Sequence, residues 1–478
     1  MSRFGRHFVR TRALKEFERN LVHLVVDRPG VLNEQHEALF RYAAVLAQMN
    51  LLRTPAGQDV SVAEDVDGLR RWMVETLSEL IPSSKEADVK TLRQLAPVLA
   101  IRLEKTRAAV LERHINDFGP EHLDDEIRHK TLVFALGGGG GAGLMHLGVF
   151  SLFNELGHCP ELIVGSSMGS IMGALRALDR EYDPINTALS LPRDISYNAI
   201  FRPFTGYSRF GFPGAFHMNL LRVAREIFHK LIGRSTLHFD DLPIKLHVVT
   251  SGIRTGFQMD DSEFESKGGE GFSPLALRRK LRLFFKVVRQ LSSNPRFLAQ
   301  IVFGKEHDTL SFPVVEAVGF SCAVPGLLHY DVYHDDPETV LPLEDIFERH
   351  QLLRLCDGGV VNNVPSKVAW DSVQQGLVGS RNCYVFGSDV FAPISSGRNL
   401  VWVPVQQIAR RNVVNNIPYA DHHKTFQSPP SPLQVIVNKY SRLKSIIQSS
   451  RDELEADAPY IKRSLTDLPP YGIWLDEQ

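Results

Sequence analysis

The sequence has few cysteines, no excess of charge of either sign and no long uninterrupted apolar run. Its four cysteines, Cys159, Cys322, Cys356 and Cys383, are scattered without a CxxC pair. This argues against a disulfide framework or a zinc site and indicates reduced, buried thiols. A formal net charge of −1 excludes a nucleic-acid binder that acts through overall positive charge. No apolar run approaches the about 18 residues of a membrane span, and the N-terminus lacks the apolar region of a secretory signal. These absences predict a soluble, cytoplasmic protein.

The 478 residues divide by composition and hydrophobic pattern into three parts. Residues 1–128 are poor in glycine and repeat apolar residues at helical spacing, which predicts a helical N-terminal region without a catalytic constellation. Between 131 and 392, short Val/Ile/Leu/Phe runs alternate with helical patterns, which is typical of an α/β domain whose mostly parallel sheet is flanked by helices. An irregular insertion is expected at about 190–310. Residues 393–478 are expected to form a C-terminal extension with a Pro/Ser linker and an amphipathic helix.

Five consecutive glycines follow the apolar run TLVFAL and precede a helical pattern. Gly138, Gly140 and Gly143 fit GxGxxG in the strand-to-helix context of a dinucleotide-binding turn. Two features weaken this interpretation. The nearby acid, Glu161, begins the next apolar run instead of ending it, and no GK[ST] sequence follows the glycines. Nucleotide binding therefore remains a disfavoured alternative.

A second motif, Gly165-Ser166-Ser167-Met168-Gly169, also lies between an apolar run and a helical pattern. In this context G-x-S-x-G predicts a nucleophile elbow, whose strained central serine projects its hydroxyl from the end of the sheet. The flanking glycines let the strand and the helix approach closely. Ser166 is not central, and we expect it to pack or to bond locally. The structural alternative for Ser167 is a helix N-cap serine.

A serine hydroxyl needs a base to take its proton. Asp357 follows the apolar run LLRLC and precedes Gly358 and Gly359, at a strand end where an α/β sheet presents reactive groups. The alternative is a plain Asp-Gly turn.

A Ser-His-Asp triad in the α/β-hydrolase order would need a histidine after the acid. His422 and His423 satisfy that order, but they lie in the polar stretch YADHHKTF, where surface or structural roles are expected. His146, one turn into the helix after the glycines, is expected to pack or to bond locally. The residues therefore favour a Ser-Asp dyad and leave a triad open.

With the glycine run, GSSMG and DGG in this order, residues 131–392 resemble the patatin-like phospholipases. The stretches GLMHLGVFSLFNEL, AVGFSCAVPGLLHY and DGGVVNNVPSKVA resemble that family too. The resemblance implies a three-layer α/β/α domain that hydrolyses phospholipid or lysophospholipid esters without a metal or other cofactor. It assigns Ser167 as the nucleophile, Asp357 as the base and the backbone N–H groups around Gly139, Gly140 and Gly141 as the oxyanion hole. The remaining motif glycines are Gly138, Gly143, Gly165, Gly169, Gly358 and Gly359.

The chain departs from the family at Ala142, where Arg or Lys usually precedes the last glycine of the run. The change keeps the backbone donors and removes a positive charge. It supports a second hypothesis, in which the same fold is a catalytically silent or nucleotide-sensing interaction module.

A basic amphipathic helix is predicted inside the insertion, at residues 275–291. Such a helix suits peripheral docking on an anionic membrane, and its alternative is a core helix with a solvated basic face. Its predicted apolar stripe contains Leu277, Leu281, Phe284, Phe285, Val288 and Leu291. The candidate docking residues are Arg278, Arg279, Arg282, Lys286 and Arg289.

Overall fold

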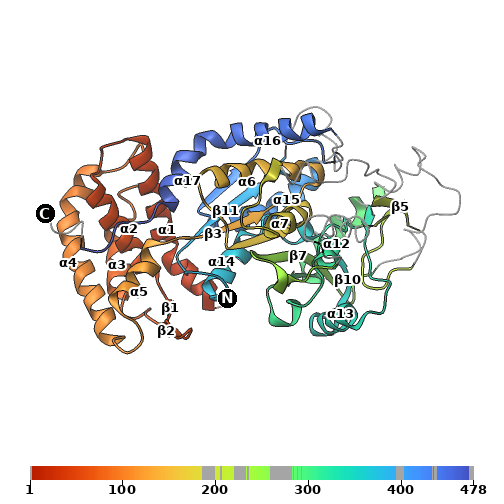
Figure 1. Ribbon diagram of the computed structural model, residues 1–478, viewed down its shortest axis with the longest axis horizontal. Coiled ribbons are helices and arrows are strands. Elements are labelled where there is room, and N and C mark those ends of the chain that lie inside the picture. Colours follow the sequence, from red (N-terminus) through yellow and green to blue (C-terminus); the bar gives the residue numbers. More distant parts are fainter. Residues whose placement is uncertain are drawn as a thin grey trace. The chain divides into compact units, whose positions relative to one another are not determined.

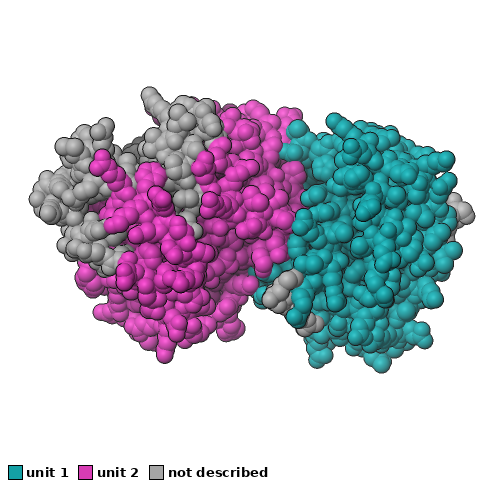
Figure 2. Space-filling view, turned by 180° about the vertical axis from the view of Figure 1, so that it is seen from behind, with its two compact units in different colours: residues 1–132, 370–385, 456–478 teal, residues 133–369, 386–455 magenta. Residues whose placement is uncertain are grey.

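The computed structural model of the chain forms two compact units, coloured separately in Figure 2. One contains residues 1–132, 370–385 and 456–478, and the other contains residues 133–369 and 386–455. None of the described helices is long and apolar enough to cross a membrane. The structure describes residues 3–185, 200–204, 207–219, 233, 236–258, 282–283, 285–287, 289–291, 293–393, 403–432, 434 and 439–472.

The first unit is mainly helical, as its sequence predicts. Two of its helices begin at side-chain caps, because Asn33 accepts from the His36 N–H (2.8 Å) and Asp88 accepts from the Thr91 N–H (3.0 Å). Leucines and alanines from all five N-terminal helices form one buried core, which Leu468 joins from the C-terminal segment. The elements are α1 (Arg3–Asp27), α2 (Glu34–Gln48), the short antiparallel pair β1 (Leu51–Arg53) and β2 (Asp59–Ser61), α3 (Asp67–Thr76), α4 (Val89–Arg113) and α5 (Pro120–Arg128).

A seven-stranded, mostly parallel sheet organises the second unit, with helices flanking it (Figure 1). Every residue of β3, β4 and β11 is buried, as expected for parallel strands covered on both faces. This confirms the predicted α/β class. The strands are β3 (Thr131–Leu136), β4 (Leu162–Ser166), β7 (Lys245–Arg254), β8 (Leu298–Phe303), β10 (Leu352–Cys356), β11 (Cys383–Asp389) and β12 (His422–Thr425). The helices include α6 (His146–Glu155), α7 (Met168–Ala177), α12 (Val314–Ser321), α13 (Pro337–His350) and α14 (Ser366–Gln374).

The ten-residue strand β7 brings two other strands end to end. A strand can pair along two edges. β8 pairs with residues 248–253 along one edge of β7, so the strands β4 and β10, which pair with overlapping residues, lie along the other edge. On that edge β4 pairs in parallel with residues 245–249, and β10 pairs antiparallel with residues 251–254. β4 and β10 therefore run toward each other along one edge of β7. Both β7 and β8 fall inside the segment 190–310 that was expected to be an insertion, yet they belong to the main sheet.

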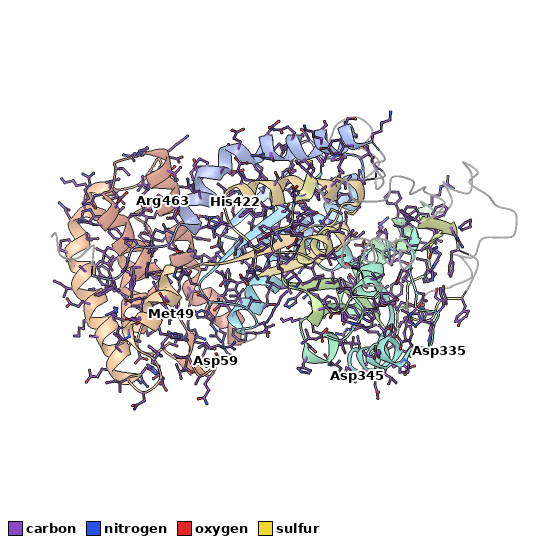
Figure 3. All side chains as sticks on the ribbon, in the orientation of Figure 1. Met49, Asp59, Asp335, Asp345, His422 and Arg463 are labelled. Atoms are coloured by element: carbon purple, nitrogen blue, oxygen red, sulfur yellow. The ribbon has the colours of Figure 1, made fainter. Side chains whose placement is uncertain are left out.

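A smaller three-stranded sheet lies beside β10 in the second unit. Its strands are β5 (Phe201–Pro203), β6 (Phe216–Met218) and β9 (Leu328–His329). The backbone of Phe210 and Phe212 bonds to Leu355 on β10 at 2.8 Å each way. Near α13, Asp335 and Asp345 (Figure 3) pair with Arg209 (2.8 Å) and Arg349 (2.7 Å), respectively.

The C-terminal residues contribute to both units. In the second unit, β12 pairs in parallel with β11, and α16 (Tyr440–Leu454) packs along α6 (Figure 1). The predicted amphipathic stretch thus forms a helix from Tyr440 onward. The other elements here are α15 (Val403–Asn416) and α17 (Ala458–Leu465). The short 3-10 segments of the chain are η1 (Gly140–Met145), η2 (Phe239–Asp241), η4 (Pro295–Phe297), η5 (His307–Thr309), η6 (Gly358–Val360), η8 (Ile417–Tyr419) and η9 (Glu455–Asp457).

Candidate active site

Ser167 lies in the sharp turn between β4 and α7, in a backbone conformation that non-glycine residues rarely adopt. Its φ is 53° and its ψ is −127°. Among the described non-glycine residues, it shares a positive φ with Gln351 alone. Such a conformation costs about 1–3 kcal/mol and persists when the surroundings enforce it. The side chain makes no capping hydrogen bond to α7, so the N-cap alternative is not realised in this structure.

The two glycines of the motif are required by close backbone packing. A Cβ at Gly165 would lie 2.5 Å from the Gly169 carbonyl oxygen, and a Cβ at Gly169 would lie 2.3 Å from the Leu136 carbonyl oxygen. Neither neighbour is a flexible side chain, so no larger residue fits without moving the strand or the helix. The elbow geometry therefore follows from glycine at both positions.

Asp357 reaches the elbow because of the end-to-end arrangement of β4 and β10. Ser166 pairs with Val249 on β7, and Cys356 pairs with Ser251, two residues further along the same edge. A Cβ at Gly358 would lie 2.1 Å from the Val249 carbonyl oxygen and 2.7 Å from Ser166 Oγ. The turn after β10 thus sits directly against the end of β4. The sequence correctly placed Asp357 at a strand end, but that strand runs antiparallel to its partner β7.

The Asp357 carboxyl group is buried and only half satisfied. Its Oδ1 accepts from the Gly359 N–H at 2.8 Å, whereas Oδ2 has no hydrogen-bond partner among the described residues. Burial raises the pKa of Asp357 to about 6, against the opposing effects of the Ser167 hydroxyl and the Gly359 N–H. The Asp-Gly turn expected as the alternative is therefore present, but it occupies one carboxyl oxygen and leaves the other available near Ser167.

The glycine loop between β3 and α6 has most of its N–H groups already committed. Gly138 donates to Asn363 Oδ1 (3.2 Å), Gly141 to the Pro432 carbonyl (2.9 Å) and Ala142 to the Gly139 carbonyl (3.2 Å). The N–H groups of Gly139 and Gly140 donate to no other group in the part of the chain that the structure describes. Of the three predicted oxyanion donors, Gly141 is therefore occupied in this structure, and Gly139 and Gly140 remain.

The loop contacts the elbow at its two ends. A Cβ at Gly138 would lie 2.6 Å from Ser167 Cβ, and a Cβ at Gly143 would lie 2.3 Å from Met168 Cγ. Met168 opens α7, and the first N–H groups of a helix have no partner within the helix. Its N–H is a further donor next to the nucleophile. Ala142 is buried in this loop, and its methyl group carries no charge.

Two polar residues that sequence reasoning missed hold this arrangement together. The buried Ser321 hydroxyl accepts from the Ser167 N–H (2.9 Å) and donates to the Val249 carbonyl (2.7 Å). Buried Asn363 connects the DGG turn to the glycine loop through Gly138. Both lie in stretches that resemble the family, FSCAVP and DGGVVNNVP, but nothing in their spacing indicates which atom they bind.

Neither His146 nor the pair His422 and His423 is placed to complete a triad with Ser167 and Asp357. His423 lies on β12, which β11 and β3 separate from β4, about 14 Å away at the usual strand spacing. Burial lowers the pKa of His423 to about 4. Its neighbour His422 (Figure 3) stacks on Phe386. His146 bridges Ser388 Oγ (2.9 Å) and the Gly137 carbonyl (2.8 Å), and burial lowers its pKa to about 4.

The predicted basic helix is described in part. Arg278 and Arg279 lie outside the described residues, as do Leu277, Leu281, Phe284 and Val288. Leu283, Val287 and Leu291 pack against a small core that contains Ile253 and Cys356. Of the predicted stripe, the structure describes Phe285, which is half-buried, and Leu291, which is buried in this core. Leu283 and Val287 pack there too, although the predicted stripe did not include them. Arg282, Lys286 and Arg289 are exposed.

Comparison with known proteins identifies a family for the sheet-containing part of the chain. Residues 134–370 match the family model of the patatin-like phospholipases. The chain is 29% identical over 128 residues to lysophospholipase NTE1 of Kluyveromyces lactis, covering 23% of this chain and 9% of that protein. The corresponding protein of Saccharomyces cerevisiae is 31% identical over 111 residues, covering 23% of this chain and 6% of that protein. Human patatin-like phospholipase domain-containing protein 6 is 38% identical over 77 residues, covering 16% of this chain and 5% of that protein.

These matches cover less than a tenth of the relatives' own length, so they bear on the domain alone. The family model begins inside β3, spans the glycine loop, the elbow and the DGG turn, and ends in α14. The chain therefore contains a patatin-like phospholipase domain, at residues 134–370.

Proposed function

We propose that the protein is a serine hydrolase that cleaves the carboxylic esters of phospholipids or lysophospholipids with a Ser167–Asp357 dyad. The observation that carries this proposal is the strained Ser167 beside a buried carboxyl group with one unpaired oxygen. A serine at an elbow is exposed to substrate, and a carboxylate whose pKa is about 6 can accept a proton at neutral pH.

In the proposed reaction, Ser167 Oγ attacks the ester carbonyl carbon while Asp357 Oδ2 takes the hydroxyl proton. The N–H groups of Gly139, Gly140 and Met168 stabilise the negative oxygen of the tetrahedral intermediate. The bond to the leaving alcohol then breaks, and that alcohol receives the proton from Asp357. Water, deprotonated by Asp357, attacks the acyl-enzyme, and Ser167 regains its proton as the fatty acid leaves.

The lipid substrate is suggested by the relatives, two of which carry the name lysophospholipase. We further propose that the exposed cations Arg282, Lys286 and Arg289 face an anionic membrane surface, where such substrates reside.

The test is covalent labelling together with hydrolysis. The full chain should react with a fluorophosphonate probe and release fatty acid from lysophosphatidylcholine. Ser167→Ala should do neither, whereas Ser166→Ala, which removes the adjacent buried hydroxyl, should keep both activities. A wild-type chain that neither reacts with the probe nor hydrolyses the lipid would favour the silent-module hypothesis instead.

A further inference from the structure

A turn in the C-terminal residues, defined by Ser431, Pro432 and Gln434, packs on the glycine loop from outside the patatin-like domain. The Gln434 N–H donates to the Ser431 carbonyl at 2.9 Å, the backbone hydrogen bond that defines this turn, and Pro432 follows Ser431 directly. Proline is favoured there because its fixed φ matches the turn. The next carbonyl, that of Pro432, accepts the Gly141 N–H at 2.9 Å. Backbone of the C-terminal turn thus bonds directly to backbone of the loop.

This packing explains two glycines that an oxyanion hole alone does not require. A Cβ at Gly140 would lie 2.3 Å from the Pro432 carbonyl oxygen, and a Cβ at Gly141 would lie 2.4 Å from the Gln434 carbonyl oxygen. Gly140 also has a φ of +56°, which disfavours side chains in any case. Gly141 has no such backbone requirement, and its nearest neighbours all belong to the C-terminal turn. Glycine at 141 is therefore explained by the approach of this turn.

The turn is anchored through α16 in the same unit. The Glu453 side chain accepts the N–H groups of Gln427 (2.7 Å) and Ser428 (3.0 Å), which lie just before the turn. About one turn earlier in the helix, the Ser450 hydroxyl donates to the Met145 carbonyl (2.7 Å). A Cβ at Gly148 on α6 would lie 2.3 Å from Ser450 Cβ, so α16 approaches α6 closely. The turn is thus fixed to the element that follows the glycine loop.

Together these bonds hold the loop on both sides of its two free donors. Gly138 is held by Asn363 on one side, and Gly141 is held by Pro432 on the other. The peptide groups between them carry the uncommitted N–H groups of Gly139 and Gly140. An oxyanion donor contributes most when its direction is fixed before the reaction begins. A loop of five glycines has little conformational preference of its own.

We propose that the turn defined by Ser431, Pro432 and Gln434 is a positioning element of the oxyanion loop, acting through the Pro432 carbonyl. The inference rests on the proposed hydrolase function. It assigns to the C-terminal extension a part in catalysis that the residues of the patatin-like domain do not supply by themselves.

The test is to loosen the turn in the full chain and to measure loop mobility and turnover separately. Pro430→Gly with Pro432→Gly should speed amide hydrogen exchange in the peptide that covers residues 137–145. The same variant should lower kcat at least 10-fold with little change in KM. Pro432→Ala, which keeps the carbonyl and restricts the backbone more than glycine does, should recover most of the rate. The matched control is Pro469→Gly with Pro470→Gly, two exposed prolines of the C-terminal segment, which should change neither quantity.

Three outcomes would overturn the inference. The first is unchanged hydrogen exchange in the Pro430/Pro432 variant, and the second is faster exchange with an unchanged kcat. The third is a rise in kcat, which would mean that the turn hinders catalysis. A second variant, Gly141→Ala, places its Cβ against the turn and should resemble the Pro430/Pro432 variant in both measurements. A wild-type chain without hydrolysis or probe labelling would instead overturn the proposed function. The two failures are therefore distinguishable.

Discussion

At the scale of single residues, burial raises the pKa of the Asp357 carboxyl group to about 6, which would suit the proposed role of a base at neutral pH. The sequence could identify Asp357 and Ser167 because each lies in a short motif at an element boundary. It could not show that one carboxyl oxygen is unpaired or that Ser321 holds the elbow, because both depend on contacts between distant parts of the chain. Such contacts follow from packing and have no local signal in the sequence.

The pKa of Asp357 predicts the pH dependence of turnover. Asp357 must be ionised to accept the Ser167 proton, and its pKa is about 6. We therefore expect kcat/KM to rise tenfold per pH unit below about pH 6 and to level off above it. Initial rates between pH 4.5 and 8.5 would check this. A profile that is flat through pH 6, or that falls as pH rises through it, would contradict the assignment.

The same shift predicts that Asp357→Asn stabilises the fold while it removes activity. A carboxyl pKa that folding raises from 3.8 to about 6 makes ionisation costly in the folded state. That cost is absent below pH 3.8 and is fully present above pH 6, where it is on the order of 1–3 kcal/mol. The introduced asparagine side chain keeps an oxygen for the Gly359 N–H. The variant should unfold at a higher temperature than wild type at pH 7.5, and this difference should shrink toward pH 4.

Removing the Ser321 hydroxyl should impair turnover more than stability alone explains. Ser321→Ala leaves the Ser167 N–H and the Val249 carbonyl without their partner, so we expect kcat to fall about 10- to 100-fold as the elbow relaxes. Thr309→Val is the matched control, because the Thr309 hydroxyl also accepts an N–H, from Gly304 (3.0 Å), and donates to a carbonyl, that of Glu306 (2.9 Å). Each variant should lose about 1–3 kcal/mol of stability. Equal kcat values for the two variants would assign Ser321 a purely structural role.

At the scale of elements, the strands beside the motifs were predictable and their arrangement was not. Apolar runs identify β3, β4, β7, β10 and β11, and β3, β4 and β11 are buried along their whole length, as strands covered on both faces are. Nothing local indicates that β4 and β10 share one edge of β7, because pairing register depends on partners far away in the sequence. The contact between Pro432 and the glycine loop could not be predicted for the same reason. The sequence QSPPSP predicts only an interruption of regular secondary structure.

The basic helix segment allows a test of membrane contact at the element scale. Leu283, Val287 and Leu291 pack inside the unit, whereas Arg282, Lys286 and Arg289 are exposed, so the test addresses these charges. Changing Arg282, Lys286 and Arg289 to Glu should reduce sedimentation with phosphatidylserine-containing liposomes at least 10-fold, because each cation near an anionic surface contributes about 1 kcal/mol. The control makes the same charge change on the exposed α4 residues Lys90, Arg102 and Lys105. Equal loss in both variants would indicate a net-charge effect and contradict the proposed face.

At the scale of the whole molecule, the two ends of the chain fold together. The sequence suggested a separate helical region at 1–128 and a separate extension from 393. The first unit instead combines residues 1–132 with 370–385 and 456–478. Its core includes Leu468, and Arg41 on α2 donates to the carbonyls of Arg463 (3.1 Å) and Ser464 (3.0 Å). The hydrophobic periodicity of a segment does not indicate which other segment it packs against. Each of these segments is amphipathic by itself, and its partner lies hundreds of residues away in the sequence.

The packing of the two chain ends in one unit predicts a variant that lowers stability without changing the rate of catalysis. Glu37 is buried on α2 and accepts a hydrogen bond from Arg463 Nε at 2.9 Å. Arg463→Ala therefore removes a cationic hydrogen-bond donor from a buried carboxylate. We expect a loss of about 1–3 kcal/mol and a drop in Tm of several degrees. The control is Arg12→Ala, because its ion pair with Glu16 is exposed and such pairs contribute about 0–1 kcal/mol. The rate of fluorophosphonate labelling well below Tm should match wild type in both variants, because every residue of the proposed machinery lies in the other unit. If Arg463→Ala slowed labelling at full folding, the first unit would have to act on the catalytic residues directly.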